Sequence, residues 1–401
     1  MSDPKTTAVI VGYVRSPFTK GGKGALKSVR PDDMAAQVIK ALMERTGVKP
    51  EDIEDLKLGN AFPEGEQGLN MAKNVAFIAG LPETVSGVTT NRFCGSSMQT
   101  LIDAANAIKA GEAEVVIAAG VESMSRIPMG GFNPSPNPTL MASYKQAYDS
   151  MGKTAETVAK KFNISRDAQE DLALESHRKA AIAEKEGLFR AEMTAITTPK
   201  GEVISRDDGI RPDTTKEKIA GLKPAFDKAG TVTAATSSPT SDGAVALMVV
   251  SQAYAEKHGL PIMATVKASA TVGCAPEIMG MGPVAAAKKA LAKAGLTMND
   301  IDVVEINEAF GSQSVACIKE LGMDMAKVNK DGGAIAIGHP LGASGARISG
   351  KAASILQREG SRYAIATMCI GGGQGIAVVL ENPNGVSGRK PAAKKTAAPK
   401  R

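Results

Sequence analysis

The chain has 401 residues, of which 43% are hydrophobic, with 42 glycines and no tryptophan. This is the composition of a globular α/β protein, and the length is sufficient for two or three domains. No apolar run approaches the roughly 18 residues that span a bilayer, and the N-terminus lacks the hydrophobic core of a signal peptide. Because the C-terminus is no peroxisomal address either, we expect a cytoplasmic protein without a membrane span.

The net charge of +6 is concentrated at one end of the chain. From Gly385 onward there are six lysines and arginines and no acidic residue, so the remaining body is close to neutral. A disordered, solubilising tail is the usual explanation, and weak binding to nucleic acid or to an acidic membrane is the alternative. The body has few aromatic residues, so we expect no nucleic-acid partner for the folded part.

The first candidate for chemistry is Cys94, which follows a strand-like segment at residues 85–93. After it, apolar residues recur at the spacing of one buried helical face, at Met98, Leu101, Ile102, Ala105 and Ile108. The pattern places the thiol at a helix N-terminus, where the partial positive charge favours the reactive thiolate. A lone cysteine is more often a buried structural residue, so this motif alone leaves both interpretations open.

Residues 124–240 differ in character from the segments on either side. Prolines interrupt regular structure at Pro128, Pro134, Pro136 and Pro138. An amphipathic pattern at residues 164–186 then predicts a helix. We interpret this region as an insertion that covers the site.

A pair of polar residues follows a predicted strand at residues 302–306 and precedes a helix. A buried Asn307 can orient a water molecule or a substrate oxygen. Glu308 can serve as a catalytic acid, but a carboxylate at the start of a helix is the commoner explanation for a glutamate in this position.

The chain has only three histidines, so a catalytic base can be sought by elimination. His177 lies in a charged helical segment and His258 at an apparent helix end, and we expect both to be exposed. His339 alone lies among glycines, which allow close backbone approach to a ligand. Its imidazole could deprotonate Cys94 and then hold a thioester oxygen. A turn histidine without a catalytic role is the alternative.

Cys369 ends a predicted strand at residues 363–370 and is followed by Gly371, Gly372 and Gly373. A thiol with a pKa near neutrality can move a proton at the α-carbon of a thioester, and the amides of a glycine turn can hold an oxyanion. A cysteine packed beside a hairpin turn is the alternative. None of the four cysteines belongs to a CxxC pair, so we expect no zinc site.

The two halves of the chain resemble each other. Residues 47–62 align without gaps with residues 295–310, an offset of 248, and Gly, Asp, Ile, Ala and Phe recur in place. A second pair of amphipathic segments begins at residues 95 and 342, and an apolar strand follows each. Two related α/β domains explain this pattern. A pseudo-twofold axis between them would bring Cys94 near the loops of His339 and Cys369.

The motifs as a set strongly resemble those of the thiolase family, which comprises acetyl-CoA acetyltransferases and 3-ketoacyl-CoA thiolases. The resemblance runs from Arg15 to about Leu380 and includes residues 121–125, 151–156 and 222–226. It implies an α/β fold, a duplicated five-layered αβαβα sandwich with an inserted loop domain. We therefore expect an N-terminal half at residues 1–123 plus 241–264, the insertion at 124–240, a C-terminal half at 265–382, and a basic disordered tail at 383–401.

The same resemblance implies roles for individual residues. Cys94 would carry the acyl group, and His339 would activate it. His339 and a water held by Asn307 would form one oxyanion hole, and the amides of Cys94 and Gly371 would form the other. Cys369 would be the second acid and base. The family's contacts to coenzyme A fall on Arg211, Ser238, Ala309 and Phe310.

The resemblance further implies that coenzyme A and acetyl-CoA are substrates, with no permanently bound cofactor and no metal. It implies a homodimer or homotetramer, which could associate with a β-oxidation hydratase/dehydrogenase. A ketoacyl synthase would normally need two active-site histidines, and only His339 is available here. A non-catalytic acyl-CoA-binding relative would be expected to lack one of the catalytic residues, and all are present.

Two departures bear on the branch of the family. Short-chain, biosynthetic members commonly have His-Met-Gly where this chain has Ser-Met-Gly at residues 150–152, and Asn-Ala-Ser-Gly where it has Thr-Ser-Ser-Pro at residues 236–239. Residues 95–99 resemble the fatty-acid-degrading branch. We therefore favour a degradative 3-ketoacyl-CoA thiolase, with a biosynthetic acetoacetyl-CoA thiolase as the alternative.

Overall fold

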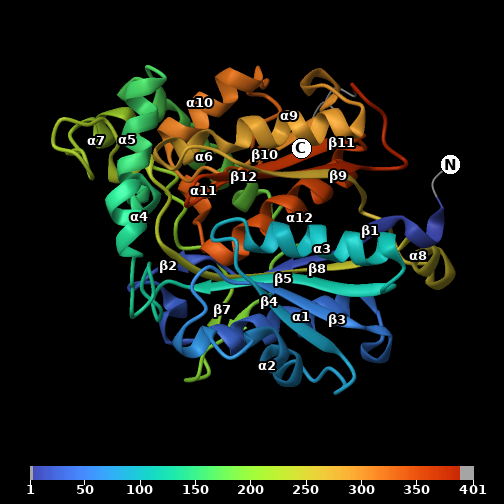
Figure 1. Ribbon diagram of the computed structural model, residues 1–401. Coiled ribbons are helices and arrows are strands. Elements are labelled where there is room, and N and C mark those ends of the chain that lie inside the picture. The colour runs from blue at the N-terminus through green and yellow to red at the C-terminus, as the bar shows by residue number, and fades with distance from the viewer. Residues whose placement is uncertain (1–2, 389–401) are drawn as a thin grey trace, which may run out of the picture.

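The computed structural model describes residues 3–388. Its elements stack in five layers, helix–sheet–helix–sheet–helix, from the bottom to the top of Figure 1. The layers confirm the duplicated sandwich expected from the sequence. Their main helices, from bottom to top, are α1 (Pro31–Thr46) and α2 (Met71–Ile78), then α3 (Ser96–Ala110) and α12 (Leu341–Glu359), then α9 (Gly282–Ala294) and α10 (Gly311–Leu321).

The strands form one path of neighbours in the order β10-β11-β12-β9-β1-β8-β5-β3-β4, with β2 (Thr19–Lys20) beside β8. The two halves of this path join where β1 pairs with β9 over only two residues, Val9 with Thr265 and Ile10 with Ala264. The lower sheet contains β1 (Ala8–Arg15), β3 (Asp55–Gly59), β4 (Ser86–Thr90), β5 (Val115–Ser123) and β8 (Ser241–Ser251). The upper sheet contains β9 (Ala264–Gly273), β10 (Val303–Ile306), β11 (Tyr363–Ile370) and β12 (Gln374–Glu381).

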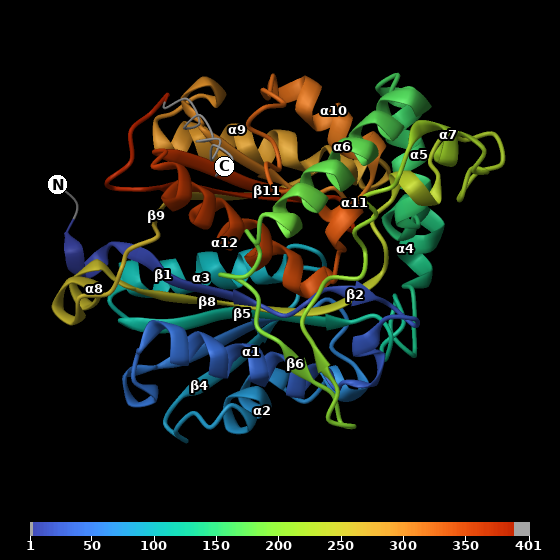
Figure 2. The same cartoon turned by 180° about the vertical axis from the view of Figure 1, so that it is seen from behind.

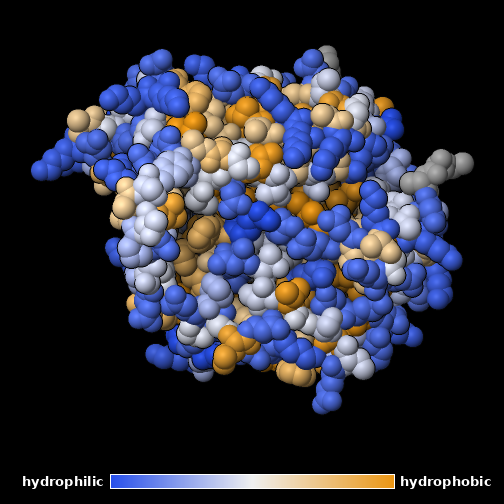
Figure 3. All heavy atoms as spheres, in the orientation of Figure 1, coloured by the Kyte–Doolittle hydropathy of each residue, from blue (hydrophilic) through white to orange (hydrophobic). Residues whose placement is uncertain are grey.

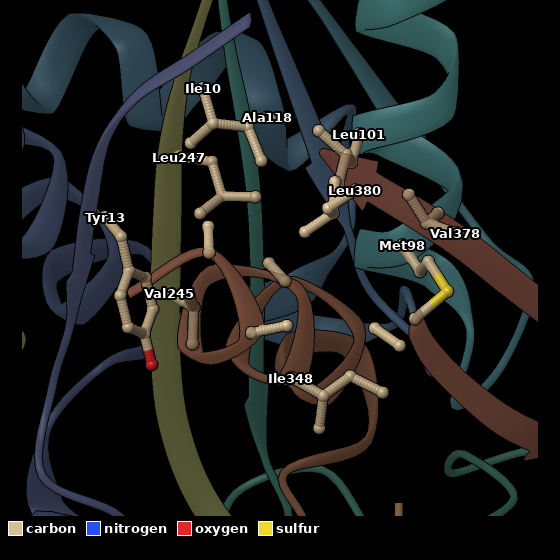
Figure 4. Packing of buried hydrophobic residues seen from close by; sticks show 14 of the residues in the cluster. Ile10, Tyr13, Met98, Leu101, Ala118, Val245, Leu247, Ile348, Val378 and Leu380 are labelled. Atoms are coloured by element: carbon tan, nitrogen blue, oxygen red, sulfur yellow. The ribbon is translucent and has the colours of Figure 1, made fainter. Parts of the chain in front are cut away.

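The strands β1, β5 and β8 are buried over their whole length, which explains why they are near-continuous apolar runs rather than alternating patterns. In β8, Val245 and Leu247 belong to the central core. Ala246 and Met248 belong to a second core, which lies between the lower sheet and the helices α1 and α2. The central core combines side chains from both sheets with those of α3 and α12 (Figure 4). Ile348 on α12 lies in the middle of this cluster.

The internal repeat extends to individual hydrogen bonds. The carboxylate of Glu54 accepts the backbone N–H of Val115 at the start of β5, at 3.1 Å. The carboxylate of Asp302 accepts the N–H of Tyr363 at the start of β11, at 3.0 Å. Both members of the second pair lie 248 positions after their counterparts, the offset found in the sequence. In each half, a carboxylate directly before one strand therefore binds the start of the parallel strand that pairs with it, β3 with β5 and β10 with β11.

Between β5 and β8 the chain leaves the lower sheet and forms elements that lie at one end of the sandwich and across the face seen in Figure 2 (Figures 1 and 2). The helix expected at residues 164–186 is α6, which packs against α10 and α11 (Ala334–Ile337). The expected domain boundaries, with residues 124–240 as an insertion, stay a prediction. Its other elements are α4 (Pro138–Ser143), α5 (Met151–Lys161), α6 (Arg166–Lys185), β6 (Ile196–Thr197), β7 (Val203–Ile204) and α7 (Lys216–Ala220). The short α8 (Gln252–His258) follows β8.

The chain after β12 begins with ordered contacts. Residues 383–388, expected to belong to a disordered tail, are instead held by backbone hydrogen bonds from Gly385 to Asn382 and from Val386 to Gly360. The N–H of Gly388 also donates to Asp302. The basic residues 389–401 lie outside the described part of the chain.

Hydrophilic residues cover most of the face drawn in Figure 3, with apolar residues in small groups between them. Within residues 3–388, no helix is long and apolar enough to cross a membrane. All four cysteines are free thiols.

The crossing of α3 and α12 depends on a glycine. A methyl group added at Gly345 would lie 2.3 Å from the backbone nitrogen of Met98, so the helices would have to move apart. We expect Gly345→Ala to lower the free energy of unfolding by about 1–3 kcal/mol. Gly221→Ala is the matched control, because nothing lies within 4 Å of the added methyl. Thermal denaturation measures both variants, and equal midpoints would contradict this account of the crossing.

Candidate active site

The motifs identified in the sequence meet at one small cavity of about 70 Å³. Cys94, His339 and Cys369 all line it, as the pseudo-twofold relationship of the halves predicts. The rest of the wall is mostly apolar and is formed by Met124, Met129, Met151, Ser238, Pro239, Thr240, Met279, Ala309, Phe310 and Leu341.

Cys94 lies between β4 and α3, in a turn that places its sulfur under two amides. The backbone amides of Gly371 and of Cys94 itself act on the sulfur by lowering the pKa of the thiol. Phe93, directly before it, has a φ of 42°, a left-handed conformation that costs roughly 1–3 kcal/mol for such a residue. Strain of this kind persists where the surroundings hold a residue in one fixed position.

Burial dominates the acidity of this thiol and raises the pKa of Cys94 to about 11. The expectation that the helix N-terminus favours a thiolate is therefore wrong for the protein without substrate. The amides that point at the sulfur lower the pKa, but by less than loss of water raises it. The thiol is neutral at pH 7 and needs a base to react.

His339 is held by both ring nitrogens. Its Nδ1 lies 2.6 Å from the hydroxyl of Ser344, and that hydroxyl donates to the carbonyl of Pro340 at 2.9 Å. Because a hydroxyl has one hydrogen, both bonds are satisfied only when Nδ1 carries the imidazole proton. The side-chain N–H of Asn307 then donates to Nε2 across 3.3 Å. Ser344 thus sets the tautomer in which Nε2 is the acceptor nitrogen.

Burial, together with the nearby charge of Arg347, lowers the pKa of His339 to about 3. The imidazole is therefore neutral at pH 7 and can accept a proton from a thiol. The side-chain oxygen of Asn307 is buried and has no hydrogen-bond partner among the described residues. Such an acceptor is normally satisfied by water or ligand, which suits a group that orients one of them.

Cys369 lies near the end of β11 and is fully buried. Burial raises the pKa of this thiol well above its ordinary value, and the charge of an ionised Cys94 raises it further. The condition for proton transfer, a pKa near neutrality, is therefore not met by the thiol of Cys369 in this structure. In the turn that follows, Gly373 has a φ of 87°, and a methyl group there would lie 2.4 Å from the carbonyl of Cys274. The turn therefore requires glycine.

The residues expected to contact coenzyme A fall in two places. Ser238, Ala309 and Phe310 line the same cavity as the thiols, and both the N–H and the hydroxyl of Ser238 donate to the carbonyl of Ala309. Arg211 lies apart from them, in a second cavity of about 320 Å³ that also contains Lys20 and Lys218. Pro239 lines both cavities, so the two adjoin. Asp213 lines the same cavity and pairs with Lys218, and the two remaining cations, Arg211 and Lys20, suit phosphate groups.

His177 is not exposed as expected. It is buried on the inner face of α6, where its Nδ1 accepts the backbone N–H of Arg211 at 3.2 Å. Burial lowers the pKa of this imidazole to about 4. The signal was present in the sequence, because His177 continues the stripe of Leu172, Ala173 and Ala180. His258 is exposed as expected and stacks on Tyr254.

Glu308 neither begins α10, whose N-cap is Phe310, nor lines the cavity. It is a buried acceptor for Ser176, Asn329 and the backbone of Ile335. Sequence reasoning also missed Ser344 as the partner of the imidazole. Within residues 3–388, no group of three or more His, Cys, Asp or Glu side chains could hold a metal ion.

Comparisons with known proteins agree with this geometry. The family model described as "Thiolase, N-terminal domain" matches residues 8–253, and "Thiolase, C-terminal domain" matches residues 260–382. The 3-ketoacyl-CoA thiolase of Bacillus subtilis (strain 168) is 45% identical over 386 residues, 93% of this chain and 99% of that protein. The 3-ketoacyl-CoA thiolase of Pseudoalteromonas translucida (strain TAC 125) is 48% identical over 382 residues, 93% of this chain and 98% of that protein.

Two solved structures also resemble this chain over nearly its whole length. Human mitochondrial 3-ketoacyl-CoA thiolase superimposes with a TM-score of 0.87 at 37% identity, covering 94% of this chain and 99% of that one. The acetyl-CoA acetyltransferase of Bacillus anthracis superimposes with a TM-score of 0.86 at 38% identity, covering 94% of this chain and 98% of that one. With both family models matched across nearly its whole length, the chain belongs to the thiolase family.

Proposed function

We propose that the protein is a 3-ketoacyl-CoA thiolase, which uses coenzyme A to cleave a 3-ketoacyl-CoA into acetyl-CoA and a shortened acyl-CoA. The observation that carries the proposal is two thiols and one neutral imidazole on a single buried cavity. Its relatives named 3-ketoacyl-CoA thiolase, at 45–48% identity, support the same activity.

In the first half of the reaction, Cys94 attacks the keto carbon of the substrate while Nε2 of His339 takes the thiol proton. The tetrahedral oxyanion collapses, and the bond between C2 and C3 breaks. Its electron pair passes to C2, which takes the proton of Cys369. Acetyl-CoA leaves, with the shortened acyl group on Cys94, a protonated His339 and a Cys369 thiolate.

In the second half, the Cys369 thiolate takes the proton of an incoming coenzyme A thiol. The coenzyme A sulfur attacks the acyl group, and the released Cys94 recovers the proton held by His339. The amides of Gly371 and Cys94, which act on the sulfur of Cys94 by lowering the pKa of the thiol, would hold the oxyanion of a bound acyl group. His339 and a water on Asn307 would hold the enolate oxygen.

Coenzyme A would extend from this cavity towards the cations of Arg211, Lys20 and Lys218 in the adjoining one. A cytoplasmic location is part of the proposal, as is assembly into a homodimer or homotetramer with a possible hydratase/dehydrogenase partner. Self-association is supported by β4, an edge strand, and by the exposed side chains of Phe77 and Val88 near it.

A biosynthetic acetoacetyl-CoA thiolase is the second candidate, favoured by the similarity to the acetyl-CoA acetyltransferase of Bacillus anthracis. The two candidates share the fold and the chemistry. They differ in the space available to the acyl tail, so chain length distinguishes them.

Cys94→Ser tests the acyl carrier. Incubation of the wild type with acetyl-CoA should add one acetyl mass, mapped by peptide analysis to Cys94. The variant should show no adduct, because serine is a far weaker nucleophile at neutral pH. An adduct that persists on another cysteine would contradict the assignment, and a wild type that takes up no acetyl group would favour a binding protein.

Cys369→Ala tests the proton-transfer role. The variant should lose most thiolysis and condensation, by a factor of about 10²–10⁴, while Cys94 is still acetylated slowly. Intact-mass and steady-state measurements on the same preparation separate the two effects. Full turnover by the variant would show that Cys369 serves packing alone.

The acyl-chain preference follows from the methionines around the cavity. Met124, Met129 and Met151 are flexible and polarizable, and they can move to admit an apolar chain. Each buried methylene contributes at most roughly 0.8 kcal/mol, so kcat/KM should rise a few-fold per carbon from acetoacetyl-CoA to medium-length 3-ketoacyl-CoA. Rates of thiolysis across the series measure this. A sharp optimum at acetoacetyl-CoA, with no turnover of longer chains, would establish the biosynthetic candidate.

A further inference from the structure

The segment that carries His339 is held by two carboxylates from outside it. We define the His339 loop as residues 333–344, which comprise α11, a sharp turn at Gly338 and the start of α12. Glu308, which follows β10, contacts the beginning of this loop. Glu122, at the end of β5, contacts its other end.

Glu308 binds the first residues of the loop. One of its oxygens accepts the N–H of Ile335 at 3.2 Å and the hydroxyl of Ser176 at 2.6 Å. The same hydroxyl accepts the N–H of Gly333 at 3.0 Å, so Ser176 links the carboxylate to a residue two positions before Ile335. A methyl group on Gly333 would lie 2.0 Å from the carboxyl carbon of Glu308, so the backbone passes directly over it.

Glu122 binds the far end of the loop. Its Oε2 accepts the N–H of Gly342 at 2.9 Å and the N–H of Ala61 at 2.8 Å. Its Oε1 accepts side-chain N–H groups from Gln67 at 2.8 Å and Asn60 at 3.4 Å. One carboxylate thus joins the His339 loop of the upper half to two segments of the lower half.

Neither carboxylate forms an ion pair with a described residue, and both are almost completely buried. The usual reason to bury an acid is a cationic partner. Here the partners are N–H groups and one hydroxyl, and they point at the acid from the loop and from its neighbours. A glutamine would replace one acceptor oxygen by an NH₂ group that faces another N–H.

We propose that Glu122 and Glu308 are positioning residues, one from each half, which fix the His339 loop at both ends and so keep the imidazole in place to take the proton of Cys94. This inference rests on the proposed function, through the role of His339 as the base. Neither carboxylate lines the cavity, so neither acts on the substrate itself.

If the two carboxylates only stabilised the fold, their replacement should affect Cys94 no more than replacement of another buried carboxylate. The chain offers such a residue as a matched control. Asp302 is also a buried carboxylate that accepts backbone N–H groups, from Arg362, Tyr363 and Gly388. It precedes β10, whereas Asn307 and Glu308 follow that strand, so it lies at the end away from the site. Asp302→Asn removes a similar number of bonds without touching the His339 loop.

The first experiment compares Glu122→Gln, Glu308→Gln and Asp302→Asn. Alkylation of Cys94 by iodoacetamide at pH 7.5, mapped by peptide mass, reports thiol activation without any substrate, and thermal denaturation reports stability. We expect the two glutamine variants to alkylate at least about tenfold more slowly, within the factor of about 10²–10⁴ that a general base supplies. Asp302→Asn should lower the melting temperature and leave alkylation within about twofold. Equal slowing in all three variants would overturn the proposal.

The second experiment asks whether the carboxylates act through the imidazole. In a His339→Ala background, Glu308→Gln and Glu122→Gln should slow alkylation no further, since the group that they position is gone. Additional slowing in that background would overturn the proposal. If Glu308→Gln does not fold, Ser176→Ala carries the same test at the start of the loop, and unchanged alkylation in that variant counts against it. If the single variant His339→Ala is alkylated at the wild-type rate, His339 is not the base, and the proposed function fails at that point rather than this inference.

Discussion

Exclusion of water from the space between the two halves is the constraint on which the site depends. Burial keeps the thiols of Cys94 and Cys369 protonated and the imidazole of His339 unprotonated, so the resting site contains no charge among its reacting groups. Negative charge develops on a substrate oxygen only during the reaction, and backbone N–H groups already in place would stabilise it. The energy of reorganising the surroundings is thereby avoided during the reaction.

This exclusion requires the layered packing around α3 and α12. Both helices carry residues of the site at their N-terminal ends, and both are enclosed by sheets whose facing side chains form one core. The close contact at Gly345 lets the two helix starts approach each other. The segment between β5 and β8 contributes Met124, Met129 and Met151 to the wall of the cavity. The architecture and the acidity of the thiols are therefore consequences of the same packing.

Much of the fold and of the site could be predicted from the sequence, because the repeat is visible in local sequence patterns. The strands before Cys94 and Asn307, the helices that end at Gly111 and Gly360, and the meeting of the cysteine and histidine loops all follow from those patterns. The acidity of Cys94 and the partners of Glu308 could not be predicted, because they depend on segments that only the folded chain brings together, such as the turn of Gly371 and the helix of Ser176. Local periodicity specifies elements, whereas desolvation is a property of their assembly.

The two reacting partners lie on corresponding turns of the repeat. The turn before α3 carries Cys94, and the corresponding turn before α12 carries His339. With Gly95 matched to Gly342, the counterpart of Cys94 is Leu341, and His339 lies two positions before it. An exact twofold copy would present the same side chain from both turns. The difference between the two turns therefore supplies one proton donor and one proton acceptor across the axis of a repeated scaffold.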